Sequence, residues 1–456
     1  MKEWLKVNFK INIPSNANKL IHLLQHEGYS AYVVGGCVRD SLLNRNPNDW
    51  DICTSATPTE MMAVFKDFQI IETGLQHGTI TVVVDTDTYE VTTFRIDGEY
   101  TDNRRPNSVS FTNKLEEDLS RRDFTINAMA YNDEEGLIDP FNGLTDINEK
   151  VIRCVGDPLA RFDEDALRVL RALRFACQLG FAIDFTTSMA LFIKSPLLEN
   201  ISKERINVEF CKMVVTGCFS NIMLIYPCVF SQFIPELHDI ICFDQKNPAH
   251  QYDVFTHTSK ALQADSSADL VTRLALFFHD FGKPLCYQED MDGTRHYEGH
   301  GRVGAEIVDS ILAALKFDNK TRNAVTELVY YHDSTLEVDG ANIKRWLNKL
   351  SVEQFKRLLS IRRADIKGSR QDYDIRRLEK VDKIEQQLNA ILANGECFSL
   401  KELAINGNDL IALGCQAGKE LGTILNALLQ QVINGQLKNT KEILKNEAIN
   451  IISQRS

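Results

Sequence analysis

The sequence predicts an α+β protein in which a mixed head of strands and helices is followed by an all-helical remainder. In the first third of the chain, helix-type patterns alternate with short runs of β-branched and aromatic residues, which lie at residues 32–34, 79–84 and 89–94. From Asp163 onward the apolar residues recur mainly at spacings of three and four, which is typical of helices. A length of 456 residues exceeds one hydrophobic core, so we expect two to four domains.

Composition places the chain among folded globular proteins. Hydrophobic residues make up 44% and charged residues 25%, close to the globular averages, which excludes disordered and collagen-like chains. No run approaches the ~18 apolar residues of a membrane span, and the first residues lack the apolar core of a signal peptide. The eleven cysteines are scattered without a CxxC pair. We therefore expect a cytoplasmic protein with reduced thiols and no membrane partner.

The net charge of -12 argues against a general nucleic-acid binder, because phosphate attraction needs exposed Lys and Arg. Residues 344–383 are an exception, since Lys and Arg outnumber Asp and Glu there and aromatic residues are interleaved. A pair of helices with solvated Lys and Arg side chains is the simpler explanation of this window. A backbone-binding track for RNA stays open as the alternative.

A first candidate site follows the predicted strand at residues 32–34. Gly35 and Gly36 come next, and a predicted helix carrying Arg39 begins at Val38. Glycines at a strand-to-helix turn let the backbone approach an anion such as a polyphosphate and direct N–H groups at it. A glycine pair alone is more often only a turn.

Three acidic residues downstream predict a magnesium site. Asp49 and Asp51 flank Trp50, and alternation along a strand would place both carboxylates on one face, roughly 6.6 Å apart. Glu90 is an acid inside an otherwise uncharged strand-like run and is our candidate for the third ligand. Carboxylates together with substrate phosphates suit two Mg²⁺ ions that activate an attacking oxygen and neutralise a leaving one.

A polar stripe follows in a segment that otherwise reads as an apolar helix. Asp165, Arg168, Arg171 and Arg174 recur at a spacing of three, so they are expected to share one helix face. A carboxylate beside a guanidinium offers an acceptor and paired donors, which match the Watson–Crick edge of cytosine or adenine. An exposed Asp–Arg helix pair is the simpler alternative.

The segment RRDFTINAMA holds polar residues in a run that looks buried. Arg122 is a candidate triphosphate ligand, while Asp123 and Asn127 suit either a ligand or a polar core network. Further on, Arg205 and Glu209 stand four residues apart, and we expect them to pair with each other and brace the stripe.

A second constellation lies in the predicted helical part. Six of the ten histidines fall between residues 250 and 332. The candidate ligands for one or two divalent ions are His257, His279, Asp280 and Asp365, with His300 and His332 for a second position. Such ions activate water for phosphoester hydrolysis.

The motifs of the first half resemble a known family. A strand followed by GGCVRD and DWDICTSATP is similar to the nucleotidyltransferase superfamily that includes DNA polymerase β. The motifs that then follow in order resemble class II tRNA nucleotidyltransferases, the CCA-adding enzymes and bacterial poly(A) polymerases: FRIDGEYTDNRRP, RRDFTINAMAYN, RFDEDALRVLRALRFA and ISKERINVE. The resemblance covers roughly residues 20–215, with a weaker match near the C-terminus.

The resemblance implies a polymerase-β-type head in which Asp49, Asp51 and Glu90 bind Mg²⁺. It places Asp123 and Asn127 at the ribose and assigns base reading to Asp165 and Arg168. It also associates a loop at residues 97–107, containing Gly98, Asp102, Arg104, Arg105 and Pro106, with the change from CTP to ATP.

The histidine constellation, with HDFGKP at residues 279–284, resembles the HD phosphohydrolase superfamily. A metal-binding domain with phosphatase or cyclic-phosphodiesterase activity is one implication. A degenerate HD fold that only supports tRNA is the other. The metal identity is left open.

These observations together predict an enzyme that adds C, C and A to tRNA 3′ ends from CTP and ATP. The expected parts are a catalytic head at 1–160, a helical neck for base recognition at 161–249, an HD domain at 250–385 and a tRNA-binding helical tail at 386–456. An A-adding enzyme or a poly(A) polymerase of the same fold stays open, as does a mainly hydrolytic HD enzyme. The oligomeric state is not predicted.

Overall fold

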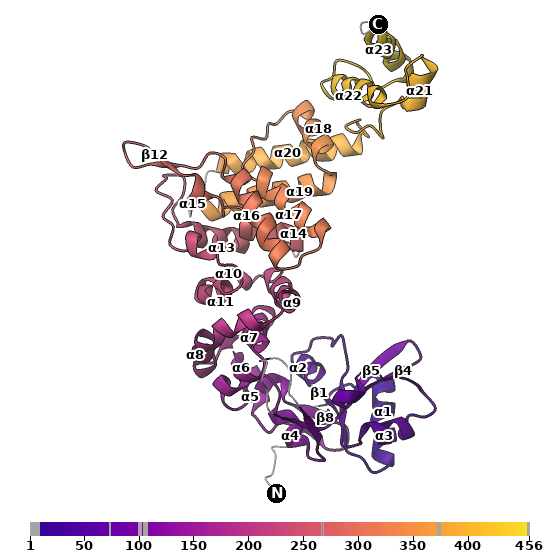
Figure 1. Cartoon of the computed structure of the whole chain (residues 1–456), viewed down its shortest axis with the longest axis vertical. Coiled ribbons are helices and arrows are strands. Elements are labelled where there is room, and N and C mark those ends of the chain that lie inside the picture. The colour runs from indigo at the N-terminus through magenta and orange to yellow at the C-terminus, as the bar shows by residue number, and fades with distance from the viewer. Residues whose placement is uncertain are drawn as a thin grey trace. The chain divides into compact units, whose positions relative to one another are not determined.

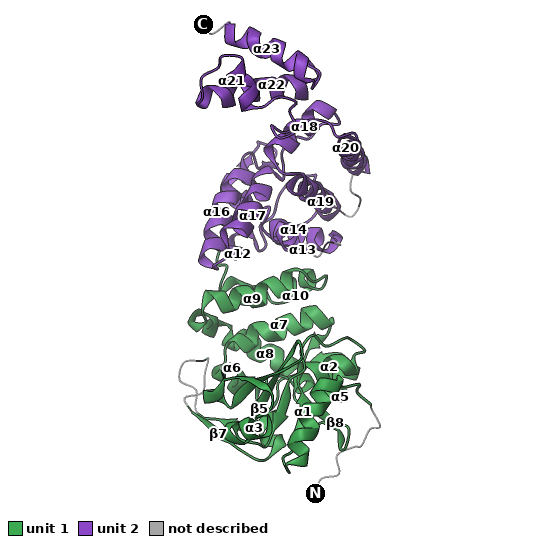
Figure 2. Ribbon diagram, turned by 90° about the vertical axis from the view of Figure 1, so that its right-hand side faces the viewer, with its two compact units in different colours: residues 1–235 green, residues 236–456 purple. Residues whose placement is uncertain are grey.

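The computed structural model describes residues 10–72, 74–98, 103, 108–265, 267, 269–370, 372 and 375–453. The chain divides into two compact units, residues 1–235 and residues 236–456 (Figure 2). Strands of the main sheet lie in unit 1, and unit 2 is almost entirely helical. The predicted α+β class is confirmed.

A seven-stranded mixed sheet forms the centre of the head (Figure 1). Its order is β3-β4-β5-β2-β1-β8-β9, and β2 and β5 pair in parallel while the other neighbours are antiparallel. The strands are β1 Ala31–Val34, β2 Ile52–Thr54, β3 Gln69–Ile71, β4 Thr79–Val84, β5 Asp87–Thr93, β8 Ala130–Asn132 and β9 Gly136–Ile138. Burial alternates along β4, which fits a strand with one face on the core.

Short helices surround this sheet. They are α1 Ser15–His26, α2 Gly36–Leu42, α3 Pro58–Val64, α4 Leu115–Ser120 and α5 Gly143–Glu149. Helix α1 buries Ala17, Leu20, Ile21 and Leu24, a three- and four-residue spacing that places them on one face. Helix α3 starts at Pro58 with a capping box between Thr57 and Glu60. A separate pair, β6 Arg95–Asp97 and β7 Val109–Phe111, lies at the base of the predicted loop.

The rest of unit 1 is helical apart from a small parallel pair, β10 Val151–Ile152 and β11 Ala182–Ile183, which the sequence did not reveal. Its helices are α6 Pro158–Glu164, α7 Leu167–Leu179, α8 Phe185–Lys194, α9 Lys203–Val214, α10 Phe219–Ile225 and α11 Pro227–Ser231. Helix α7 ends where Gly180 adopts a left-handed φ of 70°. Helices α7 and α9 pack against each other.

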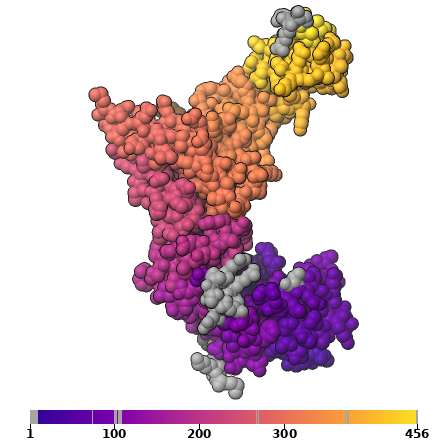
Figure 3. Space-filling model, viewed as in Figure 1, coloured from indigo at the N-terminus to yellow at the C-terminus, as the bar shows by residue number. Residues whose placement is uncertain are grey.

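Unit 2 consists of helices and one short hairpin. The helices before the tail are α12 Leu237–Ile240, α13 Val254–Ala264, α14 Leu270–Phe278, α15 Lys283–Cys286, α16 His300–Ala314, α17 Asn319–Tyr331, α18 Gly340–Lys349, α19 Val352–Ser369 and α20 Ile375–Ala393. The hairpin joins β12 Gln288–Glu289 to β13 Arg295–His296 and projects from the surface, with Met291 fully exposed (Figures 1 and 3).

The tail helices have a core of their own. They are α21 Gly407–Ala412, α22 Lys419–Ile433 and α23 Lys441–Ser453. Leu410, Ile424, Leu428 and Leu444 are fully buried in this cluster. The structure divides the chain at residue 235, while the finer four-part division stays a prediction. Among the described residues, no helix is long and apolar enough to cross a membrane. All eleven cysteines are free thiols.

Candidate nucleotidyltransferase site and a histidine cluster

The glycine turn is formed as predicted, between β1 and α2. Gly35 has a φ of 81°, and a Cβ atom at this position would lie 2.9 Å from Nη1 of Arg122. The backbone conformation favours glycine, and a side chain at this position would also displace the Arg122 guanidinium. The turn therefore brings the Arg122 guanidinium against the start of α2. Arg122 also pairs with Asp118 at 3.3 Å.

The three head acids lie at one edge of this turn. Strand β2 begins only at Ile52, so Asp49 and Asp51 precede the strand, and the prediction that they lie within it was wrong. Strands β2 and β5 pair in parallel with Ile52 opposite Val91. This register sets Asp51 beside Glu90, because each immediately precedes one of these paired residues. All three acid side chains are exposed to solvent.

Electrostatic repulsion acts between these acids. Loss of surrounding water raises the pKa of Asp51, and repulsion from Glu90 and Asp49 adds to this, while Arg122 opposes it. A carboxylate set that repels itself favours a divalent cation. Among the described residues, however, the sets whose ligand atoms lie within 4.8 Å of one another are two clusters in unit 2, not the three head acids. Asp49, Asp51 and Glu90 therefore fit Mg²⁺ by the chemistry of their carboxylate oxygens.

Asp123 and Asn127 form a polar network. This is one of the two roles that the sequence predicted for them, the other being contact with a ligand. Asp123 accepts hydrogen bonds from Asn127 at 3.0 Å and from Nε of Arg171 at 2.8 Å. Asn127 accepts in turn from Arg39 at 2.7 Å. Burial alone would raise the pKa of Asp123, but Arg171 and Asn127 hold it below its usual value. The network joins the head turn to α7.

The predicted polar stripe is only partly correct. Helix α7 begins at Leu167, so Asp165 lies before it, in extended backbone between α6 and α7. Arg168 pairs with Glu164 at 2.6 Å and donates to two backbone carbonyls. Asp165 pairs with Arg205 instead, at 3.0 Å. Asp165 and Arg168 are thus adjacent but hold different partners.

Arg205 and Glu209 brace α7 from α9, but not by pairing with each other as predicted. Arg205 reaches Asp165, and Glu209 accepts from Nε of Arg174. The contacts cross between helices because α7 and α9 pack side by side, and this proximity is not encoded in the local spacing. Arg171 is the more open member of the stripe, with 35% of its side chain exposed against 10% for Arg168 and Arg174.

In unit 2, the histidines and aspartates come together into two adjoining groups. The first consists of His257, His279 and Asp365, and the second of Asp280, His300 and His332. They come from α13, the ends of α14 and α17, the start of α16, and α19. Nε2 of His257 lies 3.1 Å from Asp365 and 3.0 Å from Nε2 of His279. All six predicted positions are therefore brought together.

The backbone fixes how three of these imidazoles present their nitrogens. Nδ1 of His279, His300 and His332 lies 2.6 to 2.7 Å from the carbonyl three residues earlier in each case. A carbonyl only accepts, so each Nδ1 carries the proton and each Nε2 presents a lone pair. Nε2 of His300 and of His332 then face each other at 3.0 Å. Facing imidazole nitrogens suit a shared cation, and a backbone carbonyl that fixes the other ring nitrogen is typical of histidines that bind a metal.

Asp280 lies between the two groups. Its Oδ2 is 3.2 Å from His279 and 3.4 Å from His257, whereas its Oδ1 is 3.6 Å from His300 and 3.7 Å from His332. Burial would raise the pKa of Asp280, but the neighbouring His279 and Lys283 hold it well below the usual value. A cavity of about 240 Å³ opens beside it, lined also by Lys283 and Arg377. One carboxylate can therefore bridge two ions.

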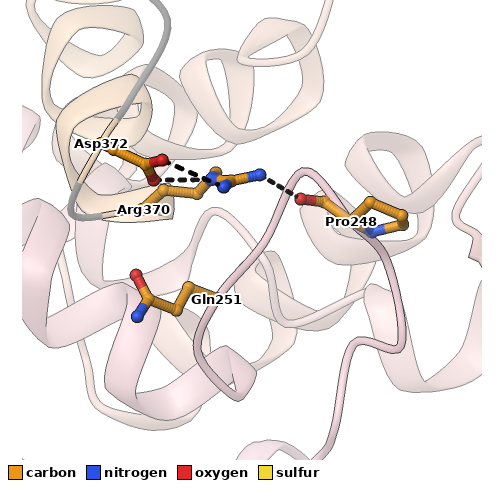
Figure 4. A pocket seen from close by; sticks show the side chains of 4 residues that line it. All are labelled: Pro248, Gln251, Arg370 and Asp372. Atoms are coloured by element: carbon orange, nitrogen blue, oxygen red, sulfur yellow. Dashed lines mark hydrogen bonds and ion pairs between the residues drawn. The ribbon is translucent and has the colours of Figure 1, made fainter.

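The basic window at 344–383 is largely neutralised within the protein. Arg357 pairs with Asp269, Arg363 with Asp382 and Lys380 with Glu337. Arg370 is also paired within the protein (Figure 4). It lines a surface hollow beside Gln251, donates to the carbonyl of Pro248 at 2.6 Å and pairs with Asp372. Lys356, Lys367 and Lys383 are exposed. Tyr373 lies outside the described residues.

Comparison with known proteins is consistent with this geometry. The sequence model for the Poly A polymerase head domain matches residues 31–153, and that for tRNA nucleotidyltransferase domain 2 matches residues 302–448. The CCA-adding enzyme of Geobacillus thermodenitrificans is 35% identical over 426 residues, which cover 93% of each chain. The chain belongs to the CCA-adding enzyme family. The CCA-adding enzyme of Pediococcus pentosaceus is 34% identical and covers 94% of this chain and 96% of its own.

A solved structure extends the likeness to the whole fold of the CCA-adding enzyme family. The Bacillus stearothermophilus CCA-adding enzyme in complex with CTP has 30% identity and a TM-score of 0.69, and it covers 96% of this chain and 97% of its own. The Thermotoga maritima CCA-adding enzyme complexed with tRNA shares the fold at 19% identity and a TM-score of 0.63. This family membership makes the chain a nucleotidyltransferase.

Two residues that shape these sites were not predicted from the sequence. Glu164 binds Arg168, and Gln245 accepts from Lys283 at 2.7 Å. Gln245 carried no signal, because it lies in an irregular segment far along the chain from its partner. Within the loop predicted at 97–107, Gly98 donates to the Ser108 carbonyl at 2.9 Å. Asp102, Arg104, Arg105 and Pro106 lie outside the described residues.

Proposed function

We propose that this chain adds C, C and A to the 3′ end of tRNA, using CTP and ATP. The observation that carries the proposal is the position of Asp51 beside Glu90, which follows from the parallel pairing of Ile52 with Val91, next to the turn that seats Arg122. In each step the 3′-hydroxyl oxygen bonds to the α-phosphorus and the bond to the bridging oxygen breaks. Pyrophosphate leaves, and the hydroxyl proton passes to solvent.

The head residues divide this work between them. Asp49, Asp51 and Glu90 hold Mg²⁺, which when bound neutralises charge on the reacting oxygens. Gly35 and Gly36 admit the triphosphate to the backbone N–H groups at the start of α2. Arg39 and Arg122 supply positive charge on either side of that turn.

The remaining residues orient the nucleoside. Asp123 and Asn127 hold the ribose side, where a 2′-hydroxyl contact favours ribonucleotides. Asp165 and Arg168 read the base edge, which requires them to exchange their present partners Arg205 and Glu164 for the nucleotide. Arg171 and Arg174 follow Arg168 on α7 and contribute further positive charge to nucleotide binding. The tail at 386–456 and exposed lysines of α19 and α20 bind the tRNA backbone.

The direct test uses tRNA transcripts ending at the discriminator base, at C and at CC. Labelled CTP and ATP are supplied separately and together with Mg²⁺. We expect all three transcripts to be completed to CCA, after which addition stops. Addition of A to the CC-ended transcript alone would identify an A-adding enzyme. A continuing run of A would identify a poly(A) polymerase.

Substitution of Asp51 tests the assignment of the acids. Asp51→Asn should lower the incorporation rate on the order of a thousandfold, because metal binding supplies several kcal/mol of transition-state stabilisation. Folding should be unaffected, since the side chain is exposed. Asp87→Asn is the matched control, because Asp87 is an exposed acid on the same strand as Glu90. Equal activity of the two variants would refute the assignment.

A second candidate function concerns unit 2. We propose that the six histidine and aspartate ligands form an HD-type site for two divalent ions that hydrolyses phosphoesters. The facing Nε2 lone pairs of His300 and His332 and the bridging position of Asp280 support it. Lys283, which pairs with Asp280 at 2.7 Å, and Arg377 offer positive charge to a phosphate in the adjoining cavity.

Metal content tests this proposal. The purified chain should bind two divalent ions in unit 2, measured by elemental analysis after exchange into Mn²⁺ or Ni²⁺. Asp280→Asn should lose both ions and any hydrolysis of p-nitrophenyl phosphate or a 2′,3′-cyclic nucleotide. Asp309→Asn, which removes an exposed acid paired with Arg322 in the same unit, is the control. Bound metal without hydrolysis would identify a degenerate HD fold that has only a structural role.

A further inference from the structure

One aromatic ring in unit 1 is contacted by three guanidinium groups. Phe175, on α7, is 4% exposed. The central carbon of Arg174 lies 4.0 Å from its ring centroid, that of Arg39 5.0 Å and that of Arg171 5.5 Å. The edge of Phe124 packs on the same ring at 5.7 Å. Each of the three arginine–ring distances lies within the range over which the negative face of an aromatic ring attracts a cation.

The ring closes a circuit that joins the head to α7. Arg39 donates to Asn127, Asn127 donates to Asp123, and Asp123 accepts from Arg171. Arg171 and Phe175 are one helical turn apart, so their side chains share a face of α7. Phe175 then contacts both ends of this chain of hydrogen bonds. Phe175 is the apolar member of a circuit whose other members are charged or polar side chains.

Three positively charged guanidinium groups crowd around Phe175 and repel one another. Burial lowers the pKa of Arg174, and repulsion from Arg171 lowers it further. Asp40, Asp123 and Glu209 offset part of this repulsion. A flat ring also fixes the plane of a stacked guanidinium and leaves its N–H donors pointing outward in that plane. Arg171 is the most exposed of the three guanidinium groups, with 35% of its side chain exposed, and it directs Nε and Nη2 at Asp123.

We propose that Phe175 is a positioning residue for nucleotide selection, which holds Arg171 in register with the Asp123–Asn127 pair. The inference rests on the proposed nucleotidyl transfer and adds a residue to it. Cytosine and uracil differ at the base edge, where an amine replaces a carbonyl. Arg168, the proposed base reader, lies on the same helix as Arg171, so an Arg171 that is free to move also loosens Arg168 and weakens this distinction.

The test compares kcat and KM for CTP and UTP on a transcript lacking CCA. Phe175→Leu should lower kcat/KM for CTP about tenfold and reduce the CTP over UTP preference about tenfold, an effect of about 1.4 kcal/mol each. Phe230→Leu is the matched control, because Phe230 is fully buried against other phenylalanines of unit 1. That variant should keep the wild-type preference. A preference unchanged in Phe175→Leu would overturn the proposal.

A second measurement avoids any loss of folding in Phe175→Leu. Progressively fluorinated phenylalanines at position 175 keep the shape of the ring while weakening its negative face. The CTP preference should decline with each added fluorine, and a flat series would show that only packing matters. Wild-type incorporation is measured alongside. Its absence would refute the proposed function itself, whereas normal incorporation with a flat series refutes only the role of Phe175.

Discussion

Asp123 connects two segments of unit 1, residues 123–127 and helix α7, through a single carboxylate. It binds Asn127, Arg171 and the amide of Phe124, and it is 7% exposed. Removing its charge leaves Arg171 without its ionic partner. Asp123→Asn should therefore lower the free energy of unfolding by about 2 kcal/mol at pH 7, the range for hydrogen bonds to charged groups.

The pH dependence of this loss has a definite sign. The folded pKa of Asp123 lies below the unfolded value of about 3.9, so its contribution is complete above that pH and declines as the pH falls toward the folded pKa. Urea unfolding at pH 7 and pH 3 should show a smaller difference between wild type and Asp123→Asn at pH 3. Asp67→Asn, at an exposed position, should differ from wild type at neither pH. An equal loss at both pH values would contradict this account.

Individual residues were predicted best where chemistry alone identified them. The glycine turn, the acid beside Asp51 and the six histidine and aspartate positions that meet in unit 2 could be named from residue type and order. Their partners could not, since Asp165 pairs with Arg205 and Arg174 with Glu209 across two packed helices. Such pairs depend on which helix faces meet, and spacing within one helix does not contain that information.

Helices α18, α19 and α20 carry the basic window, and only part of it is available to RNA. Lys356 and Lys367 are eleven residues apart on α19, three turns that return to one face. Replacing Lys356, Lys367 and Lys383 by Ala should weaken tRNA binding and flatten its salt dependence by about 0.7–0.9 per lysine in a log–log plot. Filter binding across a salt series measures this. Lys380→Ala, which removes a lysine paired with Glu337, should change the slope less.

Elements were predicted more reliably than their ends. The strand-like runs at 79–84 and 89–94 correspond to β4 and to most of β5. Asp49 and Asp51 were placed in a strand because alternation was the available argument, yet β2 starts after them. The two-residue pair β10–β11 was too short to leave a periodic pattern, and it forms through contacts distant in sequence.

At the scale of the whole molecule, the two proposed activities rest on separate cores. Contacts divide the chain at residue 235, with the head acids in unit 1 and the histidine cluster in unit 2. A ligand that binds only folded unit 2 stabilises that unit. Chelation should therefore lower the melting temperature of one calorimetric transition and leave the other in place. Asp280→Asn should abolish the response, and equal shifts of both transitions would argue against separate cores.

The strand order also bears on how the head is made during translation. Strand β1 pairs with β2 on one side and with β8 on the other, although β8 follows nearly a hundred residues later in the chain. Until the ribosome has released residues 130–132, a nascent head exposes an open edge of β1 with unpaired N–H and C=O groups. Open edges of this kind invite pairing with other chains. Protection of the growing polypeptide is thus most needed before β8 emerges.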